Sequence, residues 1–560
     1  MRRSIQSLLT IILGFILAGT AAAQSVVPVN AASYVNPALP NGSIARGSMF
    51  IAFGAGLGPA SIQVPNPFPF PSTLAGTTID VTVGSVTKRC FMVYTSAGQI
   101  AGILPSDTPI GTGTMTVRFN NVVAGTGPVK VVANSFGIFT INQQGFGPAV
   151  ATDPLAASAV YTTINSANPG DFVDIWGTGL GASLNANDDG LPQTGNLLAA
   201  GAVKVYVANV EQPVLYAGRS GCCSAIDQIR IAAPNMSGCF LPVVVTVNGV
   251  PSNYATVSIA SSGLVCTPDP VFGGPNFSQL QNGGTFETGF ISLSRSRLSF
   301  DVGLLAPQQS FDLTTDIVAA NYQRITLNAQ QVSSYAPAAV SSVGSCVVFR
   351  YTGESAEFPD ATPAVPLDAG PQLTINGPGG SSTVPKTAPG SYSKSFSTNP
   401  FPLLSPERQQ SAPYFKPGQT TVSAPGGADV QSHNASIVVP QAFQWLNKPD
   451  SGDVINRSQG KQITYSASGF DYVYIFGSSA LNVDDDAVGA AFFCAADAAA
   501  GSFTIPAPIL LSLPDSPLIE GTPTGILSVG GYVADTFTAT DLDQRSIIYS
   551  DTDLTTVDYN

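Results

Sequence analysis

The sequence predicts an all-β protein in which tandem β-sandwich domains precede a β-rich C-terminal region. Short segments of alternating apolar and polar residues recur between turn-forming residues, as in sandwich domains. A glycine-rich stretch occurs twice, about one domain length apart. Charged residues make up only 10% of the chain, against about 25% in typical globular proteins. Such a composition suits β-domains outside the cell better than helical cytosolic enzymes.

The repeated stretch predicts two equivalent corners at which a strand passes into a loop. Its glycines allow positive φ angles and close approach of backbones, so the chain can leave a sheet sharply. We expect Phe53 and Trp176 to fill the two cores, and Leu57 and Leu180 to lie beneath the loops. The two copies are FGAGLGPA (53–60) and WGTGLGAS (176–183).

The N-terminus has the pattern of a secretory leader. Arg2 and Arg3 precede an apolar run from Leu8 to Ala18, which is too short to span a bilayer comfortably. Small residues at 21–23 predict cleavage after Ala23, so residues 1–23 are assigned to a signal peptide. An uncleaved membrane anchor is the alternative.

Residues 26–142 form the first predicted domain. The segment Thr78 to Val83 alternates cleanly, so its three aliphatic residues are expected to face inward. A proline-rich loop, VPNPFPFPS, separates it from the first corner, and Phe68 and Phe70 in this loop are candidate ligand contacts. The other predicted strands are 48–53, 115–119 and 129–133.

Residues 145–265 repeat this order as a second predicted domain. Phe172 to Trp176 leads into the second corner, and Ala202 to Val207 alternates like its counterpart. A second landmark aligns Gln99 with Gln228, which favours a domain duplication. The Asn248-Gly249 pair predicts a hairpin turn between strands at 241–247 and 254–259.

The remaining chain is predicted to be mostly β-structure. Residues 266–369 are assigned to a connector and a β-rich segment, with strands flanking an exposed SRSR sequence within 290–302. Thr314 to Tyr335 contains the best helical candidate in this part of the chain. Residues 370–555 are assigned to a C-terminal β-sandwich domain, because strand signals and Gly-Gly hairpin tips return there.

Several motifs resemble those of secreted repeat proteins of soil bacteria whose domains have an immunoglobulin-like IPT/TIG fold. The resemblance implies export and tandem immunoglobulin-like sandwiches, and it implies no established activity. It covers residues 26–265 well and the C-terminal half more weakly. The motifs are NAASY (30–34), the two corners, the GQI and DQI strands, GIF (137–139), GRSGCCSAIDQI (218–229) and GCFLPV (238–243).

Seven cysteines in an exported chain predict disulfides. Cys222 and Cys223 are expected to pair with Cys239 and Cys266, one each, because adjacent cysteines bridge each other only with strain. Cys346 and Cys494 form a third candidate pair, which leaves Cys90 unpaired. A metal site at Cys222, Cys223 and Cys239 is the alternative, although the usual C-x-x-C spacing and a nearby histidine are missing.

The residues that carry enzymatic chemistry are sparse, so we predict that the protein is not an enzyme. His433 is the one histidine, and the sequence contains neither G-x-S-x-G nor H-E-x-x-H. A structural role is expected for His433, and no cofactor or metal is predicted. Two acidic loops, Asn185 to Gly190 and Asp484 to Asp486, are compatible with calcium but are interpreted as solvated turns.

The predicted function is that of a secreted or cell-surface, non-enzymatic multidomain protein acting in adhesion, ligand binding or structure. The alternative is a carbohydrate-active protein with immunoglobulin-like accessory domains, since glycoside hydrolysis needs only two carboxylates. The net charge of −13 makes nucleic acid an unsuitable partner. An extracellular polysaccharide or a cell-surface protein is the expected partner class, and no transmembrane segment is predicted in the mature chain.

Overall fold

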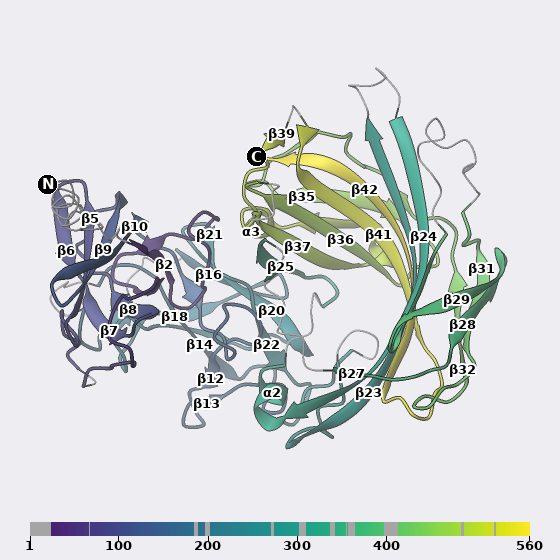
Figure 1. Ribbon diagram of the computed structural model, residues 1–560, viewed down its shortest axis with the longest axis horizontal. Helices are drawn as coiled ribbons and strands as arrows, with labels where there is room; N and C mark the ends of the chain where they lie inside the picture. The colour runs from purple at the N-terminus through teal and green to yellow at the C-terminus, as the bar shows by residue number, and fades with distance from the viewer. Residues whose placement is uncertain are drawn as a thin grey trace, which may run out of the picture.

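The computed structural model confirms the all-β class (Figure 1). The predicted signal peptide lies outside the residues that it describes. Among the described residues, helix is confined to short pieces, α2 (Ala329–Ser333), α3 (Ala507–Leu510) and the 3₁₀ turn η2 (Ala498–Ala500). The described residues are 24–66, 68–183, 189–196, 202–269, 274–301, 310–335, 342–353, 355–356, 364–396, 413–482, 487–519 and 522–560.

The first sandwich comprises residues 24–135 and lies at the N-terminal end of the molecule (Figure 1). Its core holds apolar residues from both sheets, among them the fully buried Phe50, Ile79 and Met115. One sheet contains β1 (Gln24–Ser25), β3 (Ile44–Ala45), β5 (Thr77–Val83), β6 (Val86–Arg89), β9 (Gly111–Phe119) and β10 (Val122–Val132). The other contains β2 (Val27–Asn30), β4 (Met49–Phe53), β7 (Phe91–Thr95) and β8 (Gln99–Ile103).

The second sandwich comprises residues 137–266 and is also built from two sheets. One sheet contains β11 (Gly137–Ile138), β12 (Ala151–Asp153), β13 (Ala159–Val160), β14 (Phe172–Thr178), β15 (Thr194–Asn196), β18 (Val214–Ser220) and β19 (Asp227–Ala232). The other contains β16 (Val203–Val207), β17 (Val210–Gln212), β20 (Gly238–Val247), β21 (Val250–Pro251) and β22 (Ala255–Ile259).

The two sandwiches share their strand order and register. The order β2-β4-β8-β7 in the first corresponds to β12-β14-β19-β18 in the second. Phe53 pairs with Gln99, and Trp176 pairs with Gln228. The predicted equivalence of the corners is therefore confirmed at the level of single residue pairs. Leu57 and Leu180 are both fully buried, as expected.

The expected burial of the two corner aromatics was wrong. Phe53 is 38% exposed and Trp176 is half-buried outside the second core. The reason is the two-residue period of a strand: Phe50 and Ala52 face the first core, so Phe53 points to the opposite face. Ile175 likewise faces the second core, which turns its neighbour Trp176 outward.

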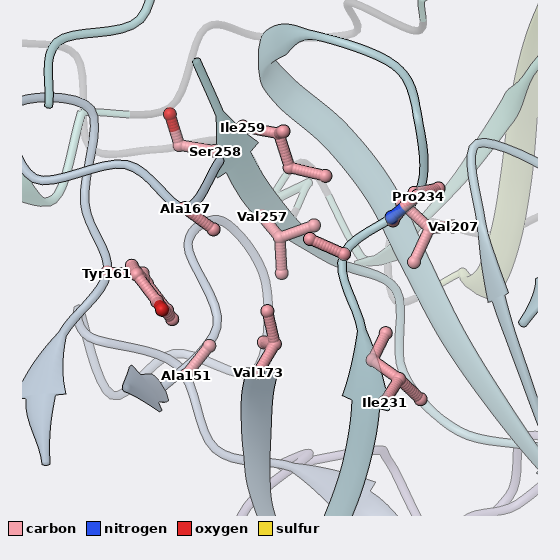
Figure 2. Close-up of a pocket in the computed structure, with 11 residues that line it drawn as sticks. Ala151, Tyr161, Ala167, Val173, Val207, Ile231, Pro234, Val257, Ser258 and Ile259 are labelled. Atoms are coloured by element: carbon pink, nitrogen blue, oxygen red, sulfur yellow. The ribbon is translucent and has the colours of Figure 1, made fainter. Parts of the chain in front are cut away.

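The core of the second sandwich is closed. Apolar side chains from both sheets surround a void of about 10 Å³ beside Tyr161, Val173 and Ile231 (Figure 2). A volume this small is at the lower limit for one water molecule, and its lining is apolar. The interior of this sandwich is therefore packing and not a binding site.

The C-terminal region is dominated by one strongly curved sheet of 15 strands (Figure 1). Three short strands, β33 (Gln444–Trp445), β35 (Lys461–Ser466) and β38 (Ser502–Ile505), form a separate sheet, and β39 (Leu518–Ile519) pairs with β40 (Thr522–Pro523). The large sheet contains β23 (Gly283–Asp301), β24 (Ser310–Asn328), β25 (Cys346–Thr352), β26 (Ser355–Ala356), β27 (Ala364–Pro366), β28 (Gln372–Gly377), β29 (Gly380–Ala388), β30 (Ser391–Ser395), β31 (Gly418–Ala424), β32 (His433–Val439), β34 (Val454–Ile455), β36 (Tyr472–Ala480), β37 (Val488–Asp497), β41 (Gly525–Thr536) and β42 (Gln544–Tyr559).

The large sheet runs across the boundary expected near residue 370. β42 lies between β41 and β23, antiparallel to the first and parallel to the second. Segments before and after residue 370 therefore belong to one hydrogen-bonded unit. The helical candidate expected within 314–335 is confirmed only at its end, because β24 extends to Asn328 and the short helix α2 follows it.

The SRSR sequence is not the exposed segment that was expected. Arg295 is buried and pairs through two nitrogens with Asp316, at 2.8 and 2.9 Å. Arg297 lies 3.1 Å from Asp551 and 2.9 Å from Asp553. The two arginines have the same parity on β23, so both project to one face of the sheet and meet carboxylates from the neighbouring strands.

Each buried Arg–Asp pair clamps the backbone of one phenylalanine. The Phe415 N–H donates to Asp316, and its carbonyl accepts from Arg295. The Phe443 N–H donates to Asp551 in the same way, and its carbonyl accepts from Arg297.

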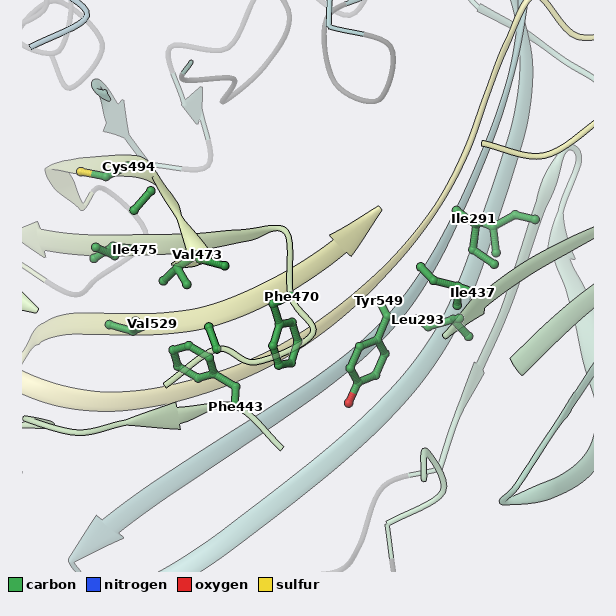
Figure 3. Close-up of a cluster of buried hydrophobic side chains, with 14 of the residues drawn as sticks. Ile291, Leu293, Ile437, Phe443, Phe470, Val473, Ile475, Cys494, Val529 and Tyr549 are labelled. Atoms are coloured by element: carbon green, nitrogen blue, oxygen red, sulfur yellow. The ribbon is translucent and has the colours of Figure 1, made fainter. Parts of the chain in front are cut away.

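The clamps hold two aromatic side chains in the main C-terminal core. Figure 3 shows Phe443, Phe470 and Tyr549 together between the strands. The rings of Phe415 and Tyr549 are 5.7 Å apart. Each Arg–Asp pair on the sheet therefore fixes the position of the loop that contains the clamped phenylalanine.

In the second sandwich, the cysteines pair differently from what was expected. Cys222 and Cys223 bridge each other, and Cys239 bridges Cys266. The tight turn between β18 and β19 keeps the adjacent pair away from the other two, which lie in a separate apolar cluster. Cys346 and Cys494 face each other on β25 and β37 and are joined, while Cys90 is free and buried.

Removing one partner of a clamp should destabilise the C-terminal region. Asp316→Asn leaves Arg295 buried without its counter-charge, and we expect a loss of about 3–5 kcal/mol in the free energy of unfolding. Urea unfolding followed by Trp445 fluorescence in a Trp176→Phe background measures it. Glu287→Gln breaks an exposed pair with Arg324 on the same two strands and should cost less than about 1 kcal/mol. Equal losses would contradict the clamp.

Candidate functional site

The best candidate site is a groove of about 650 Å³ between the first and second sandwiches. This volume lies in the range of pockets that hold small ligands. The outer face of the β2-β4-β8-β7 sheet forms one wall. Residues 133–136, between β10 and β11, form the interdomain linker. The other wall comes from the segment after this linker and from β14. We call this feature the interdomain groove.

The first wall exists because one sheet is apolar on both faces. Ile51 and Ala101 are paired on β4 and β8 and face away from the core of the first sandwich. Beside them, Tyr34 and Tyr94 are half-buried and line the groove. Tyr94 accepts a hydrogen bond from the Gln99 side-chain amide. A sheet face with this composition is suited to cover or to bind an apolar surface.

The second wall is formed by aromatic and aliphatic residues of the second sandwich. Phe139 follows the linker, and Trp176 lies near the end of β14, where the second corner begins. The Trp176 indole N–H donates to the Thr152 hydroxyl at 2.8 Å, which fixes the plane of the ring. Val160 stands at the rim and is 40% exposed.

Asn30 connects the first sandwich to the linker and to the second corner. Its side-chain amide donates to the carbonyls of Ser135 and Thr178, at 2.9 and 3.2 Å. Its side-chain oxygen accepts from the N–H groups of Ala32 and Ser33, which shapes the turn that leads to Tyr34. The NAASY motif therefore both docks the domains and presents a tyrosine to the groove.

A buried ion pair anchors the second corner to the first sandwich. Arg219 is 2.7 Å from Asp227, and both side chains are almost completely buried. The same guanidinium donates to the carbonyls of Gly47 in the first sandwich and Gly181 in the second. Asp227 also accepts from two backbone N–H groups of the corner. Burial raises the pKa of the Asp227 carboxyl, and Arg219 and the two N–H groups oppose this shift.

Two further features bring the domains close together. Gly179 has a φ of +110°, and a Cβ atom there would lie 2.0 Å from the Ser135 carbonyl oxygen, so only glycine fits. Asp189 accepts hydrogen bonds from the Ser106 backbone N–H and hydroxyl, at 2.6 and 2.7 Å. Its carboxylate is thus engaged across the domain boundary.

The groove lining holds no Asp, Glu, Lys, Arg or His among the described residues. Its ionisable groups are tyrosines. Burial raises the pKa of Tyr94 to about 12, and burial also raises the pKa of Tyr34. Neither group ionises near neutral pH, so the groove offers hydrogen bonds and aromatic faces but no charge.

The residues predicted as contacts or ligands do not gather in the groove. Phe68 and Phe70 contact each other with ring centroids 5.1 Å apart and lie outside the groove lining. Of the first acidic loop, residues 185–188 lie outside the described part of the chain, as do Asp484 to Asp486. Within the described residues, no group of three or more His, Cys, Asp or Glu could hold a metal.

His433 lies in the C-terminal region and is buried. The Gln431 carbonyl is 3.0 Å from Nδ1 and can only accept, so Nδ1 carries the proton. Nε2 then accepts from the Tyr322 hydroxyl at 3.0 Å, and the ring stacks on Phe537. Desolvation lowers the pKa of His433. This environment is that of a structural, neutral histidine.

Sequence reasoning missed the groove. The signal was present in β4, where Met49 and Ile51 are apolar on the face opposite to Phe50 and Ala52. A strand that is apolar on both faces must be covered on both. The same pattern occurs in any strand whose two faces are both covered. It therefore does not reveal that the second face of β4 is covered only in part.

No family model and no curated protein matches this sequence. Among solved structures, the chain is similar to the FN1–FN3 domains of chicken CNTN1, with 8% identity over 73% of this chain and 99% of that chain and a TM-score of 0.14. Domains 5–6 of the S-layer protein SbsC match with 12% identity over 43% and 98%, at a TM-score of 0.15. These scores carry no functional argument.

A third solved structure is SGBP-B of the mixed-linkage glucan utilization locus of Bacteroides ovatus, in complex with a mixed-linkage heptasaccharide. It matches with 10% identity over 81% of this chain and 82% of that chain, at a TM-score of 0.14. This score also carries no argument, so the all-β class rests on the strands described above. Within the described residues, no helix is long and apolar enough to cross a bilayer.

Breaking the buried Arg219–Asp227 ion pair should weaken the second corner. Asp227→Asn leaves Arg219 buried and unpaired, and we expect a loss of about 3–5 kcal/mol in the free energy of unfolding. Trp176 fluorescence during urea unfolding, in a Trp445→Phe background, reports it. The control is Glu211→Gln, which breaks an exposed pair with Lys204 in the same sandwich and should cost less than about 1 kcal/mol. A similar cost in both variants would contradict the anchoring role.

The buried histidine should make stability depend on pH. The pKa of His433 is lowered from 6.5 in the folded chain, so the unfolded chain binds the proton more readily. Its stabilising contribution is complete above pH 6.5 and is lost as the pH falls below that value. The difference in unfolding free energy between the parent chain and His433→Gln should shrink from pH 7.5 to pH 5. A constant difference would mean that the ring has the same pKa in the folded and the unfolded chain, which would contradict the effect of burial.

Proposed function

We propose that this protein is an extracellular or cell-surface protein that binds a ligand without transforming it, and that the interdomain groove is its binding site. The observation that carries the proposal is the lining of the groove, where Tyr34, Tyr94 and Trp176 present aromatic surface with no charged group among the described residues. Aromatic residues combined with depletion of charge are typical of recognition surfaces.

An extracellular location is supported by the disulfide bonds. Three disulfides occur in the described chain, and disulfides persist in oxidising compartments. The N-terminal leader pattern points to the same route.

Binding without catalysis is supported by the protonation chemistry of the site. General acid–base catalysis needs a group whose pKa lies near the working pH. The ionisable groups of the groove are tyrosines with raised pKa values. The buried carboxylates Asp316 and Asp551 are elsewhere and hold backbone N–H groups, which fits a structural task better than the alternative of a glycoside hydrolase centre.

Trp176 supplies a direct reporter of occupancy. The chain has two tryptophans, so a Trp445→Phe background leaves the groove indole as the single source of emission. We expect a saturable change in this emission with a ligand that is recovered chemically unchanged, as checked by mass spectrometry.

A matched pair of variants separates groove binding from surface adsorption. Val160→Arg places a long charged side chain at the groove rim and should abolish the saturable change. Val123→Arg is the control, because Val123 is also 40% exposed but does not line the groove. Equal binding by both variants would place the ligand elsewhere, and a ligand that is cleaved would contradict the non-enzymatic role.

A further inference from the structure

The aromatic surfaces of the groove are held in fixed positions by their neighbours. The indole of Trp176 is fixed by its hydrogen bond to Thr152, and the hydroxyl of Tyr94 is held by the Gln99 amide. Tyr34 follows the turn shaped by Asn30 and has a φ of +54°. Rigid rings lose little conformational entropy when a ligand stacks on them.

The polar groups of the groove are neutral and of both kinds. The Tyr34 hydroxyl can donate and the Gln99 side-chain oxygen can accept, because neither atom has a hydrogen-bond partner among the described residues. The amide nitrogen of Gln99 already donates to Tyr94. Gln143 adds an exposed amide at the rim. A ligand that fills the groove must therefore bring acceptors and donors, because burying unpaired polar groups is costly.

These requirements restrict the class of ligand. An anion would lose hydration without meeting an opposite charge, and a cation would meet only the faces of the aromatic rings. A purely apolar ligand would leave the tyrosine hydroxyl and the glutamine amides unpaired. A polyproline segment can stack on aromatic rings, but proline has no N–H to offer the Gln99 oxygen. A neutral sugar has apolar C–H faces for stacking and hydroxyls that both donate and accept.

We infer that the ligand of the interdomain groove is a neutral glycan chain, stacked on Tyr34 and Tyr94 of the first sandwich and on Trp176 of the second. The inference rests on the proposed function, because it names the class of ligand for the same site. The two walls belong to different domains, so the glycan contacts both and the buried Arg219–Asp227 pair sets the spacing between its aromatic contacts.

The test is isothermal titration calorimetry of the full chain with defined hexasaccharides. The neutral probes are gluco-, manno-, xylo- and N-acetylglucosamine oligomers, and hexagalacturonate is the charged counterpart. A proline-rich decapeptide and an apolar fluorescent dye represent the other ligand classes. We expect saturable binding of at least one neutral oligomer and no binding of hexagalacturonate.

Variants locate the contacts. Trp176→Ala and Tyr94→Ala should each raise the Kd about tenfold or more, and Tyr94→Phe should retain most of the affinity because the stacking face remains. Val160→Arg should abolish binding, while Val123→Arg should leave the Kd unchanged. Near-ultraviolet circular dichroism of each variant shows that the sandwiches are folded, and only variants with the parent spectrum are compared.

The outcomes separate the ligand class from the site. If the decapeptide or the dye binds and is blocked by Val160→Arg while every neutral oligomer fails, the glycan assignment is overturned and groove binding stands. Preferential binding of hexagalacturonate also overturns the assignment. If no probe binds or changes the Trp176 emission, both proposals are rejected. Binding of a neutral oligomer that Val160→Arg does not affect rejects the groove as the site.

Discussion

The arrangement of the N-terminal half depends on one buried ion pair. Arg219 and Asp227 neutralise each other inside the second sandwich, and the guanidinium also reaches the Gly47 carbonyl of the first. Because Asp227 compensates its charge, the Arg219 guanidinium can stay buried and hold the Gly47 carbonyl, which fixes the first sandwich against the second corner. The groove is the space that remains between sheets held in this position.

The two sandwiches share one strand order, but they differ in a residue that holds the domains together. Asp227 pairs with Gly177 in the second copy. In the first copy Gly98 takes the place of Asp227, next to the Gln99 that matches Gln228. The backbone N–H groups of Gly54 and Leu57 in the first corner donate to Gly98 and Ala97, within the same sandwich. A carboxylate is thus present in the copy whose corner meets another domain, and glycine stands in the copy whose corner is hydrogen-bonded within its own sandwich.

The sequence predicted the strands whose apolar residues alternate clearly, but it did not predict which distant residues contact one another. Alternation located most strands, and the shared motifs aligned Phe53 with Trp176 correctly. The same reasoning placed both side chains on the wrong face, because a shift of one residue along a strand moves a side chain to the opposite face of the sheet. SRSR was expected to be exposed because arginine usually is; its partners Asp316, Asp551 and Asp553 are distant in sequence. The groove is made by two domains, and the apolar pattern on both faces of β4 in one of them does not specify it.

The central position of β42 has a consequence for the order in which the chain acquires its structure. This strand pairs with β23, about 256 residues earlier in the sequence, and it carries Asp551, which completes one of the two clamps. Contacts of such long range form slowly. The edge of β23 that pairs with β42 stays open until residues 544–559 have been synthesised, so the large sheet completes its hydrogen bonding last.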